Sequence, residues 1–283
     1  MEIIKYTKIN GAGNDFILVD RKLNPGLEIS SDAVVALCNR EAGIGADGVI
    51  LVGDSKEYDF EMSYYNADGS GGTLCGNGAR CAIKYAEVSG RVSNKTNFLC
   101  NGIKYSGQIL PEEKIKFYLN PPGEIKNEVK VEILGQSINT GYVNVGSRHL
   151  VVFIKNILSD KQNIRSFYND LDKFPVYEVG KEIRYSSQFA PEGVNVNFVN
   201  IIDGKIYIRS YERGVERETL ACGTGSVSAA VISVLKGELT QPVKLITRSN
   251  AELVVDFDLN DDNITNLSLI GPVEINFNGE YSI

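Results

Sequence analysis

The chain has 283 residues, a net charge of -7 and a pI near 5.0. Apolar residues make up 43% and charged residues 23%, which is typical of a soluble globular protein. The acidic balance argues against nucleic-acid binding, because it repels phosphate backbones. No apolar run is long enough to cross a membrane, and the N-terminal stretch lacks a signal-peptide core, so a cytoplasmic protein is expected.

Short strand-like runs dominate the chain from its start. Alternating apolar and polar residues, rich in β-branched side chains, predict these strands. The runs lie at 3–9, 16–20, 48–54, 60–65, 114–119, 130–134, 140–145, 149–154, 194–202, 204–211, 243–247, 251–259 and 265–271.

Helical patterns are fewer. Ser30 and Ser31 can cap a short helix at 32–40, and a second helix is expected at 160–172. Two more follow Cys75 and Cys222, where small apolar residues recur at helical spacing. Because these two segments carry few charges, we expect both helices to be enclosed by other elements.

The two cysteine segments form a weak internal repeat, C-G-x-G followed by an apolar helix, about half a chain length apart. It predicts an α/β (α+β) protein of two pseudo-symmetric lobes, each a strongly curved mixed or antiparallel sheet wrapped around a central helix. The expected lobes are 1–120, joined by the terminal strand 271–283, and 121–270, with Pro-Pro-Gly at 121–123 as the boundary. A chance recurrence of four residues is the alternative.

The five cysteines do not form a pattern typical of disulfide frameworks or zinc sites. Their number is odd, no C-x-x-C pair occurs, and His149 is the only histidine. We therefore expect no metal. Cys38, Cys81 and Cys100 are predicted to pack in the core as small hydrophobic side chains.

Cys75 and Cys222 each stand where a predicted helix begins. A helix N-terminus presents unsatisfied N–H groups and partial positive charge, so it binds carboxylates or phosphates. The same environment lowers the pKa of a thiol, which predicts two reactive thiols. If both face one cleft, one thiolate can remove a proton from a carbon while the other thiol donates one to the opposite face.

Several motifs resemble those of the diaminopimelate epimerase family, in order along most of the chain. They are INGAGNDFILVD at 9–20, GIGADG at 43–48, NADGS at 66–70, CGNGARC at 75–81, GVNVNFV at 193–199, YERG at 211–214 and ETLACGTG at 218–225. The resemblance implies an isomerase without pyridoxal phosphate, metal or other cofactor. In that family LL-2,6-diaminopimelate is converted to the meso isomer, a precursor of lysine and peptidoglycan.

The resemblance also assigns roles to residues. It makes Cys75 the base towards the LL substrate and Cys222 the proton donor, with His149 and Glu212 adjusting the ionisation of the thiols. The reacting carboxylate is expected at Gly76, Asn77, Gly223 and Thr224, and the distal end of the substrate at Asn14, Asn66, Asn195, Glu212 and Arg213. A homodimer is compatible with the family.

Structural roles remain alternatives for several of these residues. His149 can belong to the core, Asn66 can cap a turn, Asn195 can be an outward strand position, and Glu212 with Arg213 can be an exposed ion pair. At the level of function, a racemase of another amino acid such as proline or hydroxyproline stays open. A thiol/disulfide redox protein or a binding protein is a further alternative.

The chain also departs from the family pattern. Ser147 and Arg148 replace the usual Asn-Pro before His149, which leaves recognition of the distal end open. Glu216 and Arg217 follow the ERG sequence, where many members have one glycine, and Gly48 stands where some members have glutamine.

Overall fold

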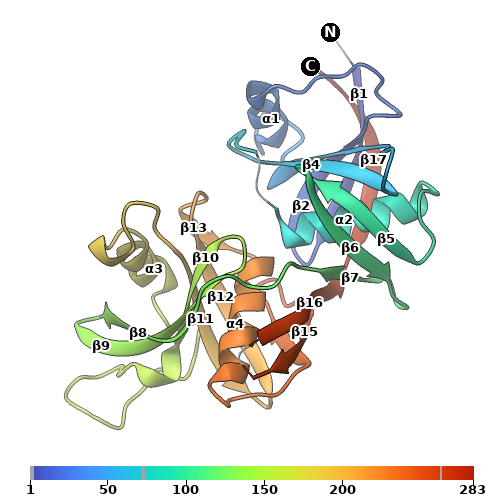
Figure 1. Ribbon diagram of the computed structural model, residues 1–283. Helices are drawn as coiled ribbons and strands as arrows, with labels where there is room; N and C mark the ends of the chain where they lie inside the picture. Colours follow the sequence, from blue (N-terminus) through green and yellow to red (C-terminus); the bar gives the residue numbers. More distant parts are fainter. Residues whose placement is uncertain (1–2, 72–73, 262) are drawn as a thin grey trace. The chain divides into compact units, whose positions relative to one another are not determined.

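The computed structural model describes residues 3–71, 74–261 and 263–283. The chain divides into two compact units (Figure 1). Unit 1 comprises the residues up to Leu119 together with Ile270–Ile283, and unit 2 comprises Asn120–Leu269. Within the described residues, no helix has the length and apolar character that a membrane span requires.

Unit 1 is a mixed sheet with two helices. Its elements are β1 (Ile3–Gly11), β2 (Asn14–Asp20), α1 (Ser31–Cys38), β3 (Gly48–Gly53), β4 (Phe60–Asn66), α2 (Gly76–Val88), β5 (Lys95–Cys100), β6 (Ile103–Ile109), β7 (Lys114–Tyr118) and β17 (Glu274–Ser282). The strand order is β17-β1-β2-β3-β4-β5-β6-β7. The last strand, β17, pairs antiparallel with β1, so both ends of the chain lie in this unit.

Unit 2 repeats this plan with different elements. They are β8 (Ile125–Ile133), β9 (Gln136–Asn144), β10 (Arg148–Phe153), η1 (Ile154–Asn156), α3 (Val176–Arg184), η2 (Ser187–Phe189), β11 (Asn195–Ile202), β12 (Lys205–Glu212), β13 (Arg217–Thr219), α4 (Gly223–Leu235), β14 (Val243–Ile246) and β15 (Glu252–Asn260); β16 (Asn263–Pro272) extends across the boundary between the units.

The topology of the two units is the same. In unit 2 the order is β8-β9-β10-β11-β12-β14-β15, and β13 pairs with the end of β12. Each unit has two parallel strand pairs that flank helices, β2–β3 and β4–β5 in unit 1 and β10–β11 and β12–β14 in unit 2. The predicted pseudo-symmetric α+β fold is therefore confirmed.

Each sheet curves around one helix. Helix α2 packs against β1, β2, β3, β4, β6 and β7, and α4 packs against β9, β10, β11, β12, β14 and β15. Buried residues cover most of both helices, including Ala79, Ala82 and Ile83 on α2 and Ala229, Ala230 on α4. Small side chains let the strands approach closely, which explains why the two weakly charged sequence segments fold as central helices.

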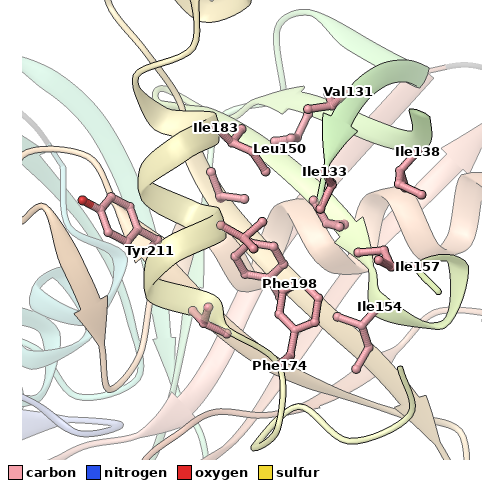
Figure 2. Packing of buried hydrophobic residues seen from close by; sticks show 14 of the residues in the cluster. Val131, Ile133, Ile138, Leu150, Ile154, Ile157, Phe174, Ile183, Phe198 and Tyr211 are labelled. Atoms are coloured by element: carbon pink, nitrogen blue, oxygen red, sulfur yellow. The ribbon is translucent and has the colours of Figure 1, made fainter. Parts of the chain in front are cut away.

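The remaining helices cover the other face of each sheet. In unit 1, Val34 and Leu37 of α1 lie in a core cluster with residues of β2 and β3. In unit 2, α3 packs over Phe198 and Tyr211 of β11 and β12 (Figure 2). Truncating a buried phenylalanine such as Phe198 typically costs about 3–5 kcal/mol of stability. These outer clusters hold the strands that carry the candidate site.

Two sequence predictions of local structure need correction. The expected helix at 160–172 is wrong, because this segment is irregular, with an isolated bridge between Leu158 and Phe167. The helix forms instead at α3, where Val176, Val179 and Ile183 share one buried face. The sequence pattern also missed β5 and β6, which have Lys and Asn at exposed positions and are stabilised by pairing with each other.

Candidate functional site

Cys75 is the N-cap of α2. Its backbone is extended, with φ −103° and ψ 115°, and Sγ accepts a hydrogen bond of 3.5 Å from the N–H of Gly78. The next two N–H groups, of Gly76 and Asn77, belong to the first turn, where a helix offers no carbonyl acceptor. The half-exposed thiol therefore stands beside backbone donors suited to an anion.

Cys222 occupies the same position on α4. Its φ and ψ are −118° and 109°, and Sγ accepts a 3.3 Å hydrogen bond from the N–H of Gly225. The hydroxyl of Thr224 lies 3.7 Å from the sulfur. The two thiols thus have the same local geometry in topologically equivalent places.

The environment of Cys222 overturns one sequence prediction. We expected the helix terminus to lower the pKa of this thiol, but burial raises it well above its usual value, and the charge of Glu212 raises it further. The hydrogen bonds from Gly225 and Thr224 oppose the increase without reversing it. Cys222 is therefore held as a neutral thiol, the form that can donate a proton.

Strand alternation brings several polar residues of unit 2 to the α4 side of the sheet. Leu150 of β10 and Val196 of β11 point into the α3 core, so the neighbouring His149 and Asn195 face the other way. His149 pairs in register with Asn195, and Asn197 with Ser210 of β12. The sequence identified His149 and Asn195 but missed Asn197, which lies on the same face two residues further along.

His149 is completely buried and hydrogen-bonded at both ring nitrogens. Nδ1 lies 3.1 Å from Nδ2 of Asn197, and Nε2 lies 2.8 Å from Oγ of Ser147. The Asn197 amide nitrogen also donates to the carbonyl of Leu150 at 3.0 Å, so it must be the NH₂ group, and Nδ1 must be the acceptor. The proton of the neutral ring is thus on Nε2. Burial, followed by the charge of Arg213, lowers the pKa of His149 to about 3.

The Asn195 amide ties the end of β11 to two neighbouring segments. Its Oδ1 accepts from the N–H of Arg213 at 2.9 Å, and its Nδ2 donates to the carbonyl of Arg148 at 2.9 Å. The exposed Arg213 side chain donates to the carbonyl of Glu192 at 3.3 Å. The adjacent Glu212 carboxylate accepts a hydrogen bond from the hydroxyl of Thr219. These contacts place Glu212 and Arg213 at the end of β12, before the loop that leads to Cys222.

In unit 1 a chain of amide groups runs beneath the N-terminus of α2. Nδ2 of Asn77 donates to Oδ1 of Asn14, and Nδ2 of Asn14 donates to the carboxylate of Asp47 at 2.9 Å. At the other end, Arg80 donates to Oδ1 of Asn77 at 2.8 Å. Asn77 is fully buried, and its side chain is held by Asn14 and Arg80, so its backbone N–H is the group left to interact with a ligand.

Asn66 lies at the end of β4 in a tight turn. Its side chain donates to the hydroxyl of Ser70 at 3.0 Å, and its backbone N–H bonds to the Ser70 carbonyl at 2.8 Å. In register, Phe16 of β2 pairs with Gly48 of β3, which pairs with Asn66. This shared edge also carries Asn14, at the start of β2.

The departures from the family pattern have structural explanations. Glu216 accepts from the N–H of Gly214 at 2.9 Å and pairs with Arg184 of α3 at 3.1 Å, so it closes the longer loop. Arg148 pairs with Glu192 at 3.0 Å. A Cβ at Gly48 would lie 2.5 Å from the Tyr65 carbonyl oxygen and 3.0 Å from the Tyr64 hydroxyl, so a larger residue does not fit there.

The other three cysteines pack in the core, as predicted. Cys38, Cys81 and Cys100 are buried, and burial raises the pKa of Cys38 to about 11 and of Cys100 to about 12. Cys81 lies against Gly11, where an added Cβ would be 3.0 Å from its sulfur. Over residues 3–71, 74–261 and 263–283, no group of three or more His, Cys, Asp or Glu side chains is placed to hold a metal ion.

The predicted site residues therefore form two sets. Asn14, Asn66, Cys75, Gly76 and Asn77 belong to unit 1, and His149, Asn195, Glu212, Arg213, Cys222, Gly223 and Thr224 belong to unit 2. Sequence reasoning missed Asp47, Arg80 and Asn197. Of these three, only Asn197 could have been found from the strand pattern, because it lies two residues after Asn195 and therefore on the same face of the strand.

Comparison with known sequences finds a family model described as diaminopimelate epimerase, matched at residues 6–121 and 141–275. The chain is 35% identical to the diaminopimelate epimerase of Aquifex aeolicus, over 99% of this chain and 98% of that relative. It is 36% identical to that of Chlorobaculum tepidum, over 97% of this chain and 100% of the relative.

Solved structures share the fold at much lower sequence identity. A PhzF-family phenazine biosynthesis protein from Bacillus anthracis superposes with a TM-score of 0.73 at 14% identity, covering 100% of both chains. A hydroxyproline epimerase from Agrobacterium vitis has a TM-score of 0.65 at 12% identity, covering 99% of this chain and 92% of that chain. These likenesses establish the architecture.

Proposed function

Because the chain belongs to the diaminopimelate epimerase family and is an isomerase, we propose that it converts LL-2,6-diaminopimelate into the meso isomer. The reaction inverts one α-carbon by two proton transfers. Both transfers are assigned to side chains of this chain, so the proposal requires no pyridoxal phosphate and no metal.

The observation that carries the proposal is the matched position of two cysteines. Each thiol is the N-cap of the central helix of its unit, and each accepts a hydrogen bond from the N–H three residues later. Packing alone does not require a thiol at both places. A pair of equivalent acid–base groups is what inversion at a carbon requires, because the proton leaves one face and arrives at the other.

In the proposed reaction the two thiols act on opposite faces of the α-carbon. The Cys75 thiolate takes the α-proton, and its electron pair forms the new S–H bond. The Cys222 thiol then donates its proton to the carbanion on the other face. The enzyme is left with a Cys75 thiol and a Cys222 thiolate, and one proton transfer restores the starting state. The buried Cys222 thiol supports its assignment as the donor.

The proposal assigns the reacting carboxylate to the first turns of α2 and α4. Negative charge develops there when the α-proton leaves, and preorganised N–H donors stabilise such charge by about 3–4 kcal/mol each. Gly76 and Asn77 supply them in unit 1, and Gly223 and Thr224 in unit 2. The glycines allow close approach of a ligand to the backbone.

The distal amino-acid end is assigned to the exposed guanidinium of Arg213, the carboxylate of Glu212 and the amides of Asn14, Asn66 and Asn195. A guanidinium binds a carboxylate by two hydrogen bonds, and a carboxylate binds an ammonium group. Ser147 bonds to His149, so its contribution to the distal end is smaller than that of the asparagine usual in the family.

The test is exchange of the α-proton with solvent deuterium on LL-diaminopimelate. The wild-type protein should exchange this proton and produce the meso isomer, and proline, hydroxyproline and lysine should not react. Cys75→Ser and Cys222→Ser should each abolish inversion, since a hydroxyl is a far weaker acid–base group near neutral pH. Cys81→Ala, a buried cysteine on the same helix, serves as the control and should retain activity.

Two outcomes would contradict this proposal. One is absence of exchange with reduced, folded wild-type protein. The other is faster turnover of proline or hydroxyproline than of diaminopimelate, which would favour a racemase of that class.

A cytoplasmic location is part of the same proposal. The five cysteines lie within the described residues and form no disulfide there, as expected in a reducing compartment, and the proposed chemistry needs two of them reduced.

A further inference from the structure

Arg80 is a fully buried cation on α2, five residues after Cys75. Its guanidinium donates to the Gly76 carbonyl at 3.3 Å and to Oδ1 of Asn77 at 2.8 Å, and Nε has no hydrogen-bond partner among the residues that the structure describes. Within the described residues no carboxylate pairs with it. Long helical side chains point back toward the N-terminus, so the guanidinium lies under the first turn, where Cys75 is the cap.

A buried guanidinium without a counter-ion is costly, because its charge has lost water and gained no opposite charge. Burial lowers the pKa of Arg80 to about 10, and the neighbouring thiols of Cys81 and Cys75 oppose this decrease. Arg80 is therefore still a cation at neutral pH. An anion close to this turn lowers the energy of the buried charge.

The neighbouring thiols differ in their ability to supply that anion. Cys81 and Cys100 are enclosed, and burial raises the pKa of each, so both stay neutral. Cys75 is half-exposed. It is the thiol at this end of α2 that can exchange its proton with solvent or substrate.

Several other charged groups on the elements around α2 have partners of their own. Asp20 of β2 pairs with Arg91, and Asp15 pairs with Lys8 and Arg40. Lys84, on α2 itself, pairs with Glu87. Glu61 of β4 pairs with Arg21, and Lys114 of β7 pairs with Glu112. The other titratable side chains of the strands that pack against α2 are Lys5 and Tyr6 on β1, Tyr64 and Tyr65 on β4, Lys104 and Tyr105 on β6, and Lys116 and Tyr118 on β7.

We propose that Arg80 is a positioning residue that stabilises the thiolate of Cys75 in the free enzyme and so makes Cys75 the resting base. The proposal rests on the function proposed above and deepens it. The same guanidinium begins the amide chain through Asn77 and Asn14 to Asp47, so it also orients two amides of the site.

Unit 2 has the opposite electrostatic arrangement. The position equivalent to Arg80, five residues after Cys222, is Val227, which is buried and apolar. The charge that acts on Cys222 is the carboxylate of Glu212. A cation lies under one thiol and an anion beside the other, which assigns the thiolate to unit 1 and the neutral thiol to unit 2.

The experiment measures the pH dependence of alkylation by iodoacetamide, cysteine by cysteine, with mass spectrometry. The pH midpoint of each rate profile reports ionisation separately from access, because only the thiolate reacts. In a Cys222→Ser background, Arg80→Met should move the Cys75 midpoint upward by about one to three pH units, as expected for loss of a nearby opposite charge. Arg80→Lys should restore most of this shift.

Lys84→Met is the matched control, since it removes a cation from the same helix one turn further along. It should leave the Cys75 midpoint unchanged. An unchanged midpoint in Arg80→Met, or an equal shift in Lys84→Met, would overturn the proposal. Circular dichroism checks that each variant is folded.

The wild-type protein provides a test that does not depend on any variant. The pH midpoint for alkylation of Cys75 should lie below that of Cys222, and the reverse order would refute the proposal. The α-proton exchange assay distinguishes failure of the role of Arg80 from failure of the proposed function. Exchange with an unmoved Cys75 midpoint refutes only the role of Arg80, whereas absence of exchange in the wild type refutes the proposed function.

Discussion

Asn197 and His149 are joined by a 3.1 Å hydrogen bond between Nδ2 and Nδ1, across the parallel strands β11 and β10. The amide donates, because its nitrogen also lies 3.0 Å from the Leu150 carbonyl. The bond therefore selects the tautomer of His149 that carries its proton on Nε2 and directs it to Ser147.

The tautomer can be observed directly, because the chain has a single histidine. ¹⁵N NMR should show a protonated Nε2, an unprotonated Nδ1 and no titration between pH 5 and 8, since burial lowers the pKa of His149 to about 3. Asn197→Leu should produce a mixture of tautomers. Asn200→Leu, on the same strand, is the control and should leave the ring signals unchanged. A wild-type ring that titrates near pH 6.5 would refute this assignment.

Stability should depend on pH through the same ring. The folded-state pKa of His149 lies below its unfolded value, so below about pH 6.5 the unfolded chain binds a proton that the folded chain does not. Lowering the pH then favours unfolding by about 1.4 kcal/mol per pH unit, until the folded ring also titrates near pH 3. His149→Gln should lose this component.

The measurement for His149→Gln is urea unfolding of both proteins at pH 7, 6 and 5. At pH 7 the variant should be less stable, because it loses two buried hydrogen bonds. The difference in unfolding free energy should narrow as the pH falls. A difference that is the same at all three pH values would contradict the burial of a neutral ring.

Glu212 should control the ionisation of Cys222. Glu212→Gln removes the carboxylate that raises the pKa of this thiol, so the alkylation midpoint of Cys222 should fall by about one to three pH units in a Cys75→Ser background. Glu252→Gln is the control. Its side chain pairs with Lys205, at the opposite end of β12, and it should cause no shift. An equal shift in both variants would indicate a general charge effect.

Substitution by alanine should have opposite effects on stability at Gly78 and Gly225, the glycines three residues after each N-cap. A Cβ at Gly225 would overlap Oδ1 of Asn197 and lie 3.1 Å from Cys222 Sγ, whereas one at Gly78 would have its nearest neighbours at 3.5 Å. Gly225→Ala should therefore destabilise the protein by about 1–3 kcal/mol. Gly78→Ala should stabilise it by about 0.5–1 kcal/mol, since alanine favours helix.

Thermal unfolding of these two variants checks the prediction. In Gly225→Ala the displaced Asn197 amide should also disturb the His149 ring signals. Equal stability changes in the two variants would mean that the space beneath Gly225 can relax.

The sequence by itself determined the elements that depend on local pattern. The apolar periodicity after Cys75 and Cys222 predicted α2 and α4, and the serine at position 30 predicted the cap of α1, where its hydroxyl accepts from Ala33 at 3.2 Å. The motifs around the two cysteines were sufficient to identify the family. Local pattern failed at 160–172, where the packing of α3 further along the chain determines which segment is helical.

The tertiary structure alone decided the electrostatics of the site. The sign of the pKa shift at Cys222, the tautomer of His149 and the burial of Arg80 depend on partners brought in by strand register and by the curvature of each sheet around its helix. Both cysteines have the same local sequence, C-G-x-G, and the same cap geometry. The electrostatic environments of the two thiols differ, because burial and long-range charge act on a thiol as strongly as the helix terminus does. Local sequence does not encode either effect.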